Sequence, residues 1–410
     1  MADEALDNVL RPADEAELAA VIADAAAAGR PLELLGGGTK RGLGRPVEAA
    51  ALLDLSRLSG IVDYEPAELV LTARPGTPLA EIERVVAEAR QMLAFEPPHL
   101  APVFGGVADG GTLGGTLACN LSGPRRIKAG AARDHFLGFR AVNGRGEAFK
   151  AGGKVVKNVT GYDLCKLVAG SYGTLCALTE VTIKVLPAPE ATATLCLFGL
   201  APEDSIAALG EALASPHEVS GAAYAPADVA APLAIGGDGS CAAIRLEGVA
   251  PSVKARAAAL ADLWGKRGEV AALEGDAARA VWRALGEVRP FHADGASTVL
   301  WRLSVPPAAG AKAHAALRAA LPSCRLYHDW GGGLIWLEAP AAPDAAAALV
   351  RGALAGFGGH ATLIRAPAET RAAVDVFEPP DAVLGDVTRR LKQGFDPRGV
   401  LNRGRMYDGV

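Results

Sequence analysis

The sequence lacks the features that mark metal proteins. Its six cysteines are scattered, with no Cys-x-x-Cys pair and no cluster. Iron–sulfur and zinc centres need ligands gathered in space, usually visible as short spacings, so we expect small buried thiols here and no metal site. The cysteines are Cys119, Cys165, Cys176, Cys196, Cys241 and Cys324.

Neither an excess of basic charge nor a long apolar run is present. The 410 residues carry a net charge of −5, and lysine and arginine are dispersed, so no basic face for nucleic acid is indicated. The longest apolar stretches, such as AAALLDL, are too short to cross a bilayer. The first ten residues are acidic and lack the basic segment of a signal peptide. We therefore expect a soluble, intracellular protein.

What the chain does have is a succession of helical and strand patterns. Residues 15–28 predict a helix that Asp14 caps, and a short strand follows at 31–35. Residues 68–73 predict a second strand, and beyond the turn after it a helix that Thr77 caps. A hairpin is predicted around Asn143–Gly144.

After residue 190 the pattern changes to alanine-rich helices alternating with strands. This alternation predicts an α+β domain in which helices cover one face of an antiparallel sheet. The predicted helices span residues 203–214, 251–264, 310–320 and 343–355.

Two glycine-rich segments are the strongest candidates for a binding site. Residues 32–44, LELLGGGTKRGLG, fit neither the P-loop nor the Rossmann template. Successive backbone N–H groups in tight turns nevertheless form a concave site for a phosphate group. Residues 105–123, GGVADGGTLGGTLACNLSG, interleave glycine with small residues, as expected where backbone or ligand approaches closely.

Four segments, with the end of the chain, together resemble one flavoprotein superfamily. They are LLGGGTKRGLG, RPGTPLAEIE, GGTLGGTLACNLSGPRR with AARDHFLGFRAV, and KNVTGYDLCKLVAGSYGTLCALTEVTIKVLP, followed downstream by FDPRGVLNRGRM. Their order resembles the vanillyl-alcohol oxidase or PCMH-type FAD-binding fold, which the D-lactate and glycolate dehydrogenases share. QMLAFEPPH and HDWGGGLIWL resemble most the smaller flavoprotein subunit of bacterial glycolate oxidase.

This resemblance implies FAD as cofactor and a set of residues around it. The first loop would hold the pyrophosphate, the second would run beside the ribityl chain and the flavin ring, and Val181 would meet the adenine. The implied residues are Gly36, Gly37, Gly38, Thr39, Lys40, Gly76, Gly111, Thr112, Gly114, Gly115, Asn120, Ser122, Gly123, Asp134, Val181 and Asn402.

Some of these assignments have structural alternatives. Lys40 could equally be a solvated lysine, and Asp134 could be a structural residue. Some members of the superfamily bind flavin covalently through His or Cys. Residues 36–44 contain neither, so a non-covalent FAD is expected. His99, just outside the glycine-rich segment, is expected to be structural.

The resemblance also divides the chain. It implies a PCMH-type FAD-binding domain at residues 1–187, an α+β cap domain with an antiparallel sheet at 188–392, and a tail at 393–410 that returns to the flavin domain.

The second domain departs from the relatives that oxidise D-2-hydroxy acids. Those relatives carry GHxGDGNxH, a later EHG and WxxLR, which supply metal ligands and an arginine that can clamp a carboxylate. After His328 this chain has GGLIW, and Gly286 stands where the arginine is expected. The sequence therefore predicts that the flavin site is kept and the substrate site of the relatives is lost.

Three functions remain open on the sequence alone. The first is the FAD-binding subunit of a glycolate oxidase complex that oxidises glycolate to glyoxylate, with a sister flavoprotein as the catalytic subunit and an iron–sulfur subunit as further partner. It would be cytoplasmic, or peripheral at the inner membrane through its partners. The alternative is a stand-alone FAD-dependent dehydrogenase of a D-2-hydroxy acid such as D-lactate. The third, a scaffold without flavin, conflicts with the intact glycine loops.

Overall fold

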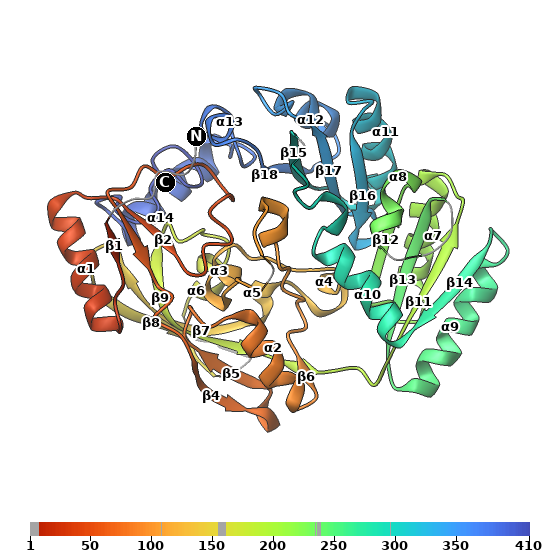
Figure 1. The fold of residues 1–410 in the computed structure, drawn as a ribbon, viewed down its shortest axis with the longest axis horizontal. Helices are drawn as coiled ribbons and strands as arrows, with labels where there is room; N and C mark the ends of the chain where they lie inside the picture. Colours follow the sequence, from red (N-terminus) through yellow and green to blue (C-terminus); the bar gives the residue numbers. More distant parts are fainter. Residues whose placement is uncertain (1–7, 108, 155–160, 234, 236–238, 296) are drawn as a thin grey trace.

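The computed structural model describes residues 8–410 except 108, 155–160, 234, 236–238 and 296. Within this range the chain forms two lobes that lie side by side (Figure 1). The N-terminal lobe holds the elements up to β10 (Leu186–Pro187), and the C-terminal lobe holds those from β11 (Ala191–Phe198) to β18 (His360–Arg365). The first part of the fourth flavin-like segment, residues 157–160, lies outside the described range.

The N-terminal lobe contains two main sheets. The smaller is parallel, with strand order β1-β3-β2, and the larger is antiparallel, with order β4-β5-β9-β7-β8. The predicted hairpin around Asn143–Gly144 is confirmed as the β7–β8 pair. The strand bounds are β1 (Val9–Leu10), β2 (Leu32–Leu35), β3 (Ala51–Asp54), β4 (Ile61–Glu65), β5 (Val70–Ala73), β7 (Phe136–Asn143), β8 (Ala148–Gly152) and β9 (Cys176–Lys184). A short pair joins β10 to β6 (Gln91–Met92).

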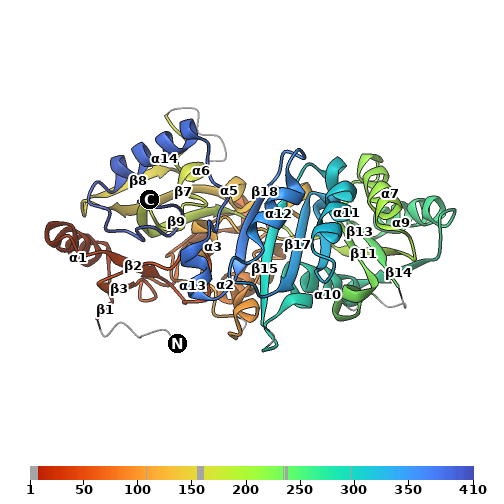
Figure 2. The ribbon, with the colours of Figure 1, turned by 90° about the horizontal axis from the view of Figure 1, so that it is seen from above.

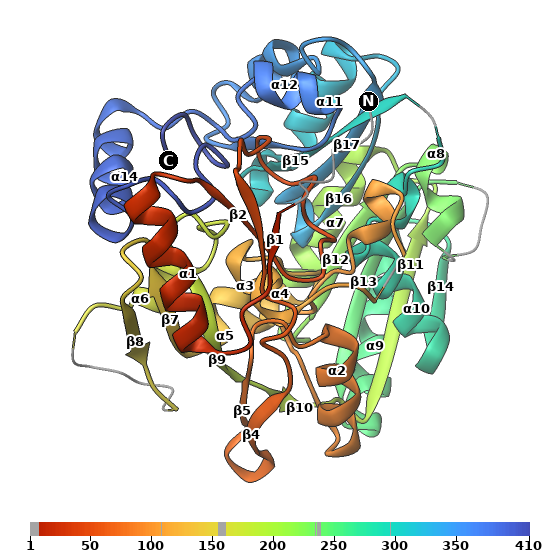
Figure 3. The ribbon, with the colours of Figure 1, turned by 60° about the vertical axis from the view of Figure 1, so that its left-hand side comes forward.

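Helix α1 (Glu15–Ala28) packs against strands of both sheets (Figure 3). Asp14 caps it as predicted, because its carboxylate accepts the Glu17 N–H at 2.9 Å. Its buried stripe, with Leu18 and Ile22, packs in one cluster with side chains of β2, β3, β7 and β9. The helix thereby fixes the position at which β2 delivers the chain to the first glycine loop.

The predicted cap of α2 (Leu79–Glu88) is wrong. Pro78 occupies the N-cap position and makes no side-chain bond to the helix. The Thr77 hydroxyl donates instead to the Arg74 carbonyl at 2.7 Å and accepts the Gly60 N–H at 2.9 Å. Thr77 is fully buried, so its hydroxyl fastens the preceding turn rather than the helix end.

Four short helices complete the N-terminal lobe. They are α3 (Leu113–Ala118), α4 (Arg126–Ala129), α5 (Ala132–His135) and α6 (Leu164–Val168). Helix α3 is formed by the second glycine-rich segment, and the Thr112 hydroxyl accepts the Gly115 N–H at its start. Residues 113–118 of the glycine-rich segment therefore form a short helix that presents little side-chain bulk.

The C-terminal lobe is built on an antiparallel sheet with the order β14-β11-β13-β12-β16-β17-β15-β18. Alternate residues of β12 (Gly221–Ala225) face opposite sides: Ala222 and Tyr224 join one core cluster, while Ala223 and Ala225 join another. The remaining strands are β13 (Cys241–Gly248), β14 (Val270–Glu274), β15 (Thr298–Ser304), β16 (Arg325–Asp329) and β17 (Leu334–Pro340).

Helices cover both faces of this sheet rather than one. Four of them, α7 (Pro202–Ala214), α9 (Ala250–Trp264), α11 (Gly310–Ala320) and α12 (Ala347–Leu354), lie on the outer face (Figure 2). Helix α10 (Gly275–Gly286) packs on the inner face, toward the N-terminal lobe, where Trp282 and Leu285 are buried. The four helices that the sequence predicted do share one face, but α10 was not among them, so the prediction of one covered face missed it. A short helix, α8 (Ala227–Ala230), follows β12.

The chain then returns to the N-terminal lobe through α13 (Ala368–Ala373) and α14 (Ala382–Phe395) (Figure 1). The buried Lys392 ammonium donates to the carbonyls of Thr174 and Leu401, at 2.7 and 2.8 Å, and pairs with Asp396. Leu401 lies beside Leu32 as a parallel bridge. We propose the division near residue 187 and the returning tail as the domain organisation, with α14 running through the boundary expected at 393.

None of the described helices combines the length and apolar character needed to cross a membrane.

Candidate functional site

A cavity in the N-terminal lobe brings the first glycine loop, α3 and the end of the chain together. Its lining comes from four segments that are far apart in the sequence: residues 34–43, 112–119, 172–178 and 402–405. Pro75 and Leu55 complete the wall. Close approach of these segments depends on the glycines in the first two.

The glycine loop is pressed against the start of α3. A Cβ atom on Gly36 would lie 2.7 Å from the Thr112 hydroxyl, and one on Gly37 would lie 1.8 Å from the Gly110 carbonyl oxygen. Gly114 is equally constrained, because its Cβ would meet Pro75 at 2.5 Å. Side chains at these positions would push the two segments apart, so the cavity wall is made largely of backbone.

Lys40 contributes a cation without a counter-charge to this wall. Its ammonium lies 3.4 Å from the Thr39 hydroxyl, and no carboxylate among the described residues pairs with it. Burial lowers its pKa, against a smaller opposing effect from the Cys119 thiol. Uncompensated positive charge beside exposed backbone N–H groups suits an anionic ligand such as a diphosphate.

The last residues of the chain hold the glycine loop from behind. Arg405 pairs with Glu33 at 2.9 Å and donates to the carbonyls of Arg41 and Leu43, at 3.0 and 3.1 Å. Arg41 pairs with the other Glu33 oxygen at 2.8 Å. Both Arg405 and Glu33 are buried, so this ion pair is shielded from water.

Asn402 adds a second clamp. Its side-chain oxygen accepts the Leu34 N–H at 2.8 Å, and its amide donates to the Tyr172 carbonyl at 2.7 Å. Tyr172 itself has a positive φ of 54°, which is unusual for a bulky residue. One side chain thus ties the loop and the 172–178 segment into the same wall.

The structure gathers nine of the sixteen predicted site residues in the cavity wall. These are Gly36, Gly37, Gly38, Thr39, Lys40, Thr112, Gly114, Gly115 and Asn402. Sequence reasoning missed Cys119, Tyr172, Gly173 and Arg405, which also line it. A signal was present for all four, since they lie inside the quoted flavin-like segments or the quoted stretch near the end of the chain.

The seven other predicted residues do not line the cavity. Asn120 and Ser122 accept the backbone N–H groups of Arg133 and Ala132, at 3.1 and 2.8 Å, and Asp134 accepts that of Ala131 at 2.8 Å. All three thus shape the turn between α3 and α5. The remaining residues are placed by packing: Gly76, Gly111 and Gly123 beside neighbouring loops, and Val181 in the core of β9.

The lining fits FAD. Backbone N–H groups and the unpaired Lys40 suit the pyrophosphate, while apolar side chains such as Leu34, Leu43 and Leu178 suit aromatic rings. Two thiols, Cys119 and Cys176, line the cavity and could form a covalent bond. Burial raises their pKa values to about 11 and about 12, so both stay protonated and unreactive at neutral pH.

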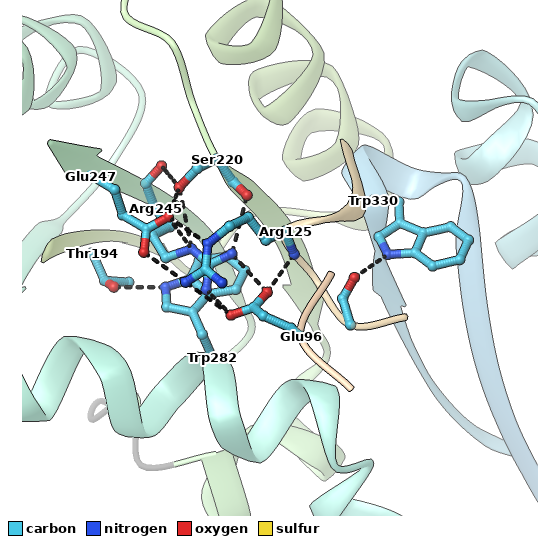
Figure 4. Close-up of polar contacts among 9 residues, drawn as sticks. Glu96, Arg125, Thr194, Ser220, Arg245, Glu247, Trp282 and Trp330 are labelled. Atoms are coloured by element: carbon cyan, nitrogen blue, oxygen red, sulfur yellow. Dashed lines mark hydrogen bonds and ion pairs between the residues drawn. The ribbon is translucent and has the colours of Figure 1, made fainter. Parts of the chain in front are cut away.

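A buried charge network joins the lobes (Figure 4). Arg245 of β13 forms a bidentate pair with Glu96 of the N-terminal lobe, at 2.7 and 3.0 Å. Arg125 of the N-terminal lobe forms the reciprocal pair with Glu247, at 3.0 and 2.8 Å. Burial acts to raise the pKa of Glu247, but the charge of Arg245 and hydrogen bonds from Arg125 and Ser220 hold it at about 2.

Trp330 makes a second contact across the junction. Its indole N–H donates to the Gly123 carbonyl at 3.1 Å (Figure 4). The guanidinium of Arg126 lies 4.2 Å from its ring centroid, and that of Arg302 lies 5.1 Å away. Trp330 also has a positive φ, 53°.

His328 and Gly286 mark the two positions at which the sequence departs from the hydroxy-acid dehydrogenases. His328 is fully buried, shares a 3.0 Å hydrogen bond with His314 and stacks on its ring. Gly286 packs on Pro124, where a Cβ would already lie 3.0 Å away. A side chain at that position would require Pro124 to shift. In the described part of the chain, no three His, Cys, Asp or Glu side chains gather as metal ligands would.

Comparison with known proteins agrees with this site. A family described as "FAD binding domain" matches residues 6–152, which include the glycine loop and α3. The chain is 39% identical over 378 residues to the glycolate oxidase subunit GlcE of Escherichia coli K12, covering 92% of this chain and 93% of that protein. It is 32% identical over 190 residues to a D-lactate dehydrogenase of Archaeoglobus fulgidus, covering 46% of this chain and 41% of that protein.

Among solved structures, the fold is similar to p-cresol methylhydroxylase with bound substrate. The TM-score is 0.70 at 15% identity, over 98% of this chain and 88% of the other. This similarity concerns the fold alone, and it confirms the predicted PCMH-type α+β architecture.

Proposed function

Because the chain belongs to the family of the glycolate oxidase subunit GlcE, we propose that it is the FAD-binding subunit of a complex that oxidises glycolate to glyoxylate. The observation that carries the proposal is the glycine-walled cavity with its unpaired Lys40. FAD bound there would supply a two-electron carrier. The chain's own residues would hold its phosphates on loop 36–40 and close the cavity with Asn402 and Arg405.

We further propose that a sister flavoprotein subunit oxidises the substrate and that an iron–sulfur subunit carries the electrons onward. Two positions support this division. His328 is buried against His314, and Gly286 is packed on Pro124, so neither can supply the metal ligand or arginine of the hydroxy-acid dehydrogenases. In the cell the chain would be cytoplasmic, with any membrane association made through its partners.

A stand-alone D-2-hydroxy-acid dehydrogenase is the second candidate. The observation in its favour is the similarity to the Archaeoglobus D-lactate dehydrogenase, but that match covers less than half of this chain. The match to GlcE covers nearly all of it.

One spectroscopic experiment separates the candidates. The visible spectrum of the purified chain alone is recorded before and after anaerobic addition of glycolate or D-lactate. A flavin spectrum that stays oxidised is expected. Bleaching by either acid would make the chain a dehydrogenase in its own right, and absence of flavin after incubation with FAD would overturn both candidates.

The cavity assignment is tested by removing the Lys40 charge. We expect Lys40→Ala to weaken FAD binding about tenfold or more, because a charge-assisted contact to phosphate is lost. Lys150→Ala is the matched control, since Lys150 is exposed on β8. Both are assayed as FAD retained after gel filtration. Equal retention by the two variants would place the pyrophosphate elsewhere.

A further inference from the structure

Two arginines at the lobe junction form no ion pair with an acidic group among the described residues. Arg126 comes from α4 and Arg302 from β15, so each lobe supplies one. Within the described residues, neither guanidinium has a hydrogen bond or an ion pair, and their contact is the Trp330 ring. Both are partly buried. Two desolvated cations beside one ring are unfavourable unless an anion joins them.

Two carboxylates influence the arginines without pairing with them. Asp134 acts on Arg126, but its side chain is partly exposed and accepts the Ala131 N–H. Asp329 is close enough to influence Arg302, yet it is buried and bonded to the Trp330 N–H at 2.7 Å. Burial raises its pKa to about 7, so it is often protonated at neutral pH. Burial, with a smaller contribution from the charge of Arg126, lowers the pKa of Arg302 to about 10. An external anion would relieve both arginines.

The cluster adjoins the cofactor cavity through Tyr172. Tyr172 lines that cavity, and its phenol is also close enough to Arg302 for each to influence the other's ionisation. Burial raises the pKa of the phenol, so it is a neutral hydrogen-bond donor. Tyr172 and Trp330 both have positive φ angles, 54° and 53°. Strain at two bulky residues around one cluster is typical of a functional site.

We propose that Arg126 and Arg302, held against the Trp330 ring, bind the carboxylate of a small organic acid. Two guanidinium groups hold a carboxylate by charge-assisted hydrogen bonds. This site goes beyond the proposed function, which places substrate oxidation in a partner, and depends on it only for the choice of glycolate as probe.

The experiment measures acid binding separately from FAD binding. The FAD-loaded chain is titrated calorimetrically with glycolate, glyoxylate and the uncharged glycolamide. We expect the two acids to bind and the amide not to bind. Arg302→Gln and Arg126→Gln should each weaken glycolate about tenfold or more with FAD content unchanged. Arg279→Gln, an exposed arginine paired with Asp276, is the control and should bind as the unmodified chain does.

A second measurement uses the unmodified chain, so that misfolding of a variant cannot explain its result. Arginines of the unmodified chain are labelled with phenylglyoxal, with and without glycolate, and the labelled peptides are identified by mass spectrometry. Protection of Arg126 and Arg302 by glycolate, and not by sulfate at equal ionic strength, is expected. Equal labelling with and without glycolate, or equal protection by sulfate, would overturn the site. Flavin retention is unaffected by either result, so failure here leaves the proposed function standing.

Discussion

Adjacent arginines at the start of helix α4 meet opposite electrostatic environments. Arg125 is paired with Glu247 and belongs to a network that locks the lobes together. Arg126, the next residue, has no acidic partner in the described structure and stacks on Trp330. Lys40 and Arg302 likewise have no acidic partner among the described residues. The difference indicates that the molecule neutralises charge where it needs rigidity and leaves charge uncompensated beside its cavity and at its proposed acid site.

The largest effect is expected from breaking the neutralised network. Arg245→Met leaves Glu96 and Glu247 facing each other with one arginine fewer, and should lower the free energy of unfolding by about 3–5 kcal/mol. Arg267→Met is the control, because Arg267 pairs with Glu211 at the surface, and should cost less than about 1 kcal/mol. Urea unfolding followed by tryptophan fluorescence measures both. Similar losses in the two variants would contradict the role of the network.

The same network predicts that the folded protein loses stability as the pH falls. The pKa of Glu247 falls from its ordinary 4.5 to about 2 in the folded protein. A depressed carboxyl pKa contributes stability above pH 4.5, and that contribution is lost as the pH falls through about 2. It amounts to about 3 kcal/mol. Melting temperatures between pH 6 and pH 2 should fall less steeply for Glu247→Gln. Parallel curves for the variant and the unmodified chain would refute the assignment.

A smaller effect is expected at the clamp behind the cavity. Arg405→Met removes the buried pair with Glu33 and two bonds to loop carbonyls. The loop should loosen, and FAD should dissociate about tenfold faster, because two or three bonds that preorganise the wall are lost. Arg403→Met is a close control, since Arg403 is exposed two residues away. Flavin fluorescence reports the release. Matched rates would show that the tail does not hold the loop.

The sequence predicted the site best where the determinants are local. Gly36–Gly38 predict a phosphate-type loop through their own composition and lie in the cavity wall, and Asp14 marks a helix start through its neighbours. Thr77 has the same local pattern as Asp14, but burial in the turn redirects its hydroxyl to Arg74 and Gly60. The local pattern of residue types does not show which hydrogen bonds the Thr77 hydroxyl forms once the chain is folded.

Long-range partners could not be predicted in the same way. Arg405 reaches Glu33 across 372 positions, and nothing in either neighbourhood specifies the other. Asn120, Ser122 and Asp134 illustrate the opposite error. They are polar residues inside flavin-like segments, but they bond to backbone N–H groups nearby, which such short side chains readily do.

The smallest effect is expected at Cys119, one of the two thiols of the cavity wall that the structure describes. Its pKa of about 11 leaves little thiolate at neutral pH, so it should neither attack the flavin nor add charge to the site. Cys119→Ala should therefore change FAD affinity by less than about twofold, the loss of a few dispersion contacts. Acid precipitation of the FAD-loaded chain should release all the yellow colour into the supernatant, from the variant and the unmodified protein alike. Colour retained in the unmodified pellet and lost in the variant would show a covalent bond at Cys119. The unpaired Lys40 would then no longer be enough to explain how the cavity keeps its cofactor.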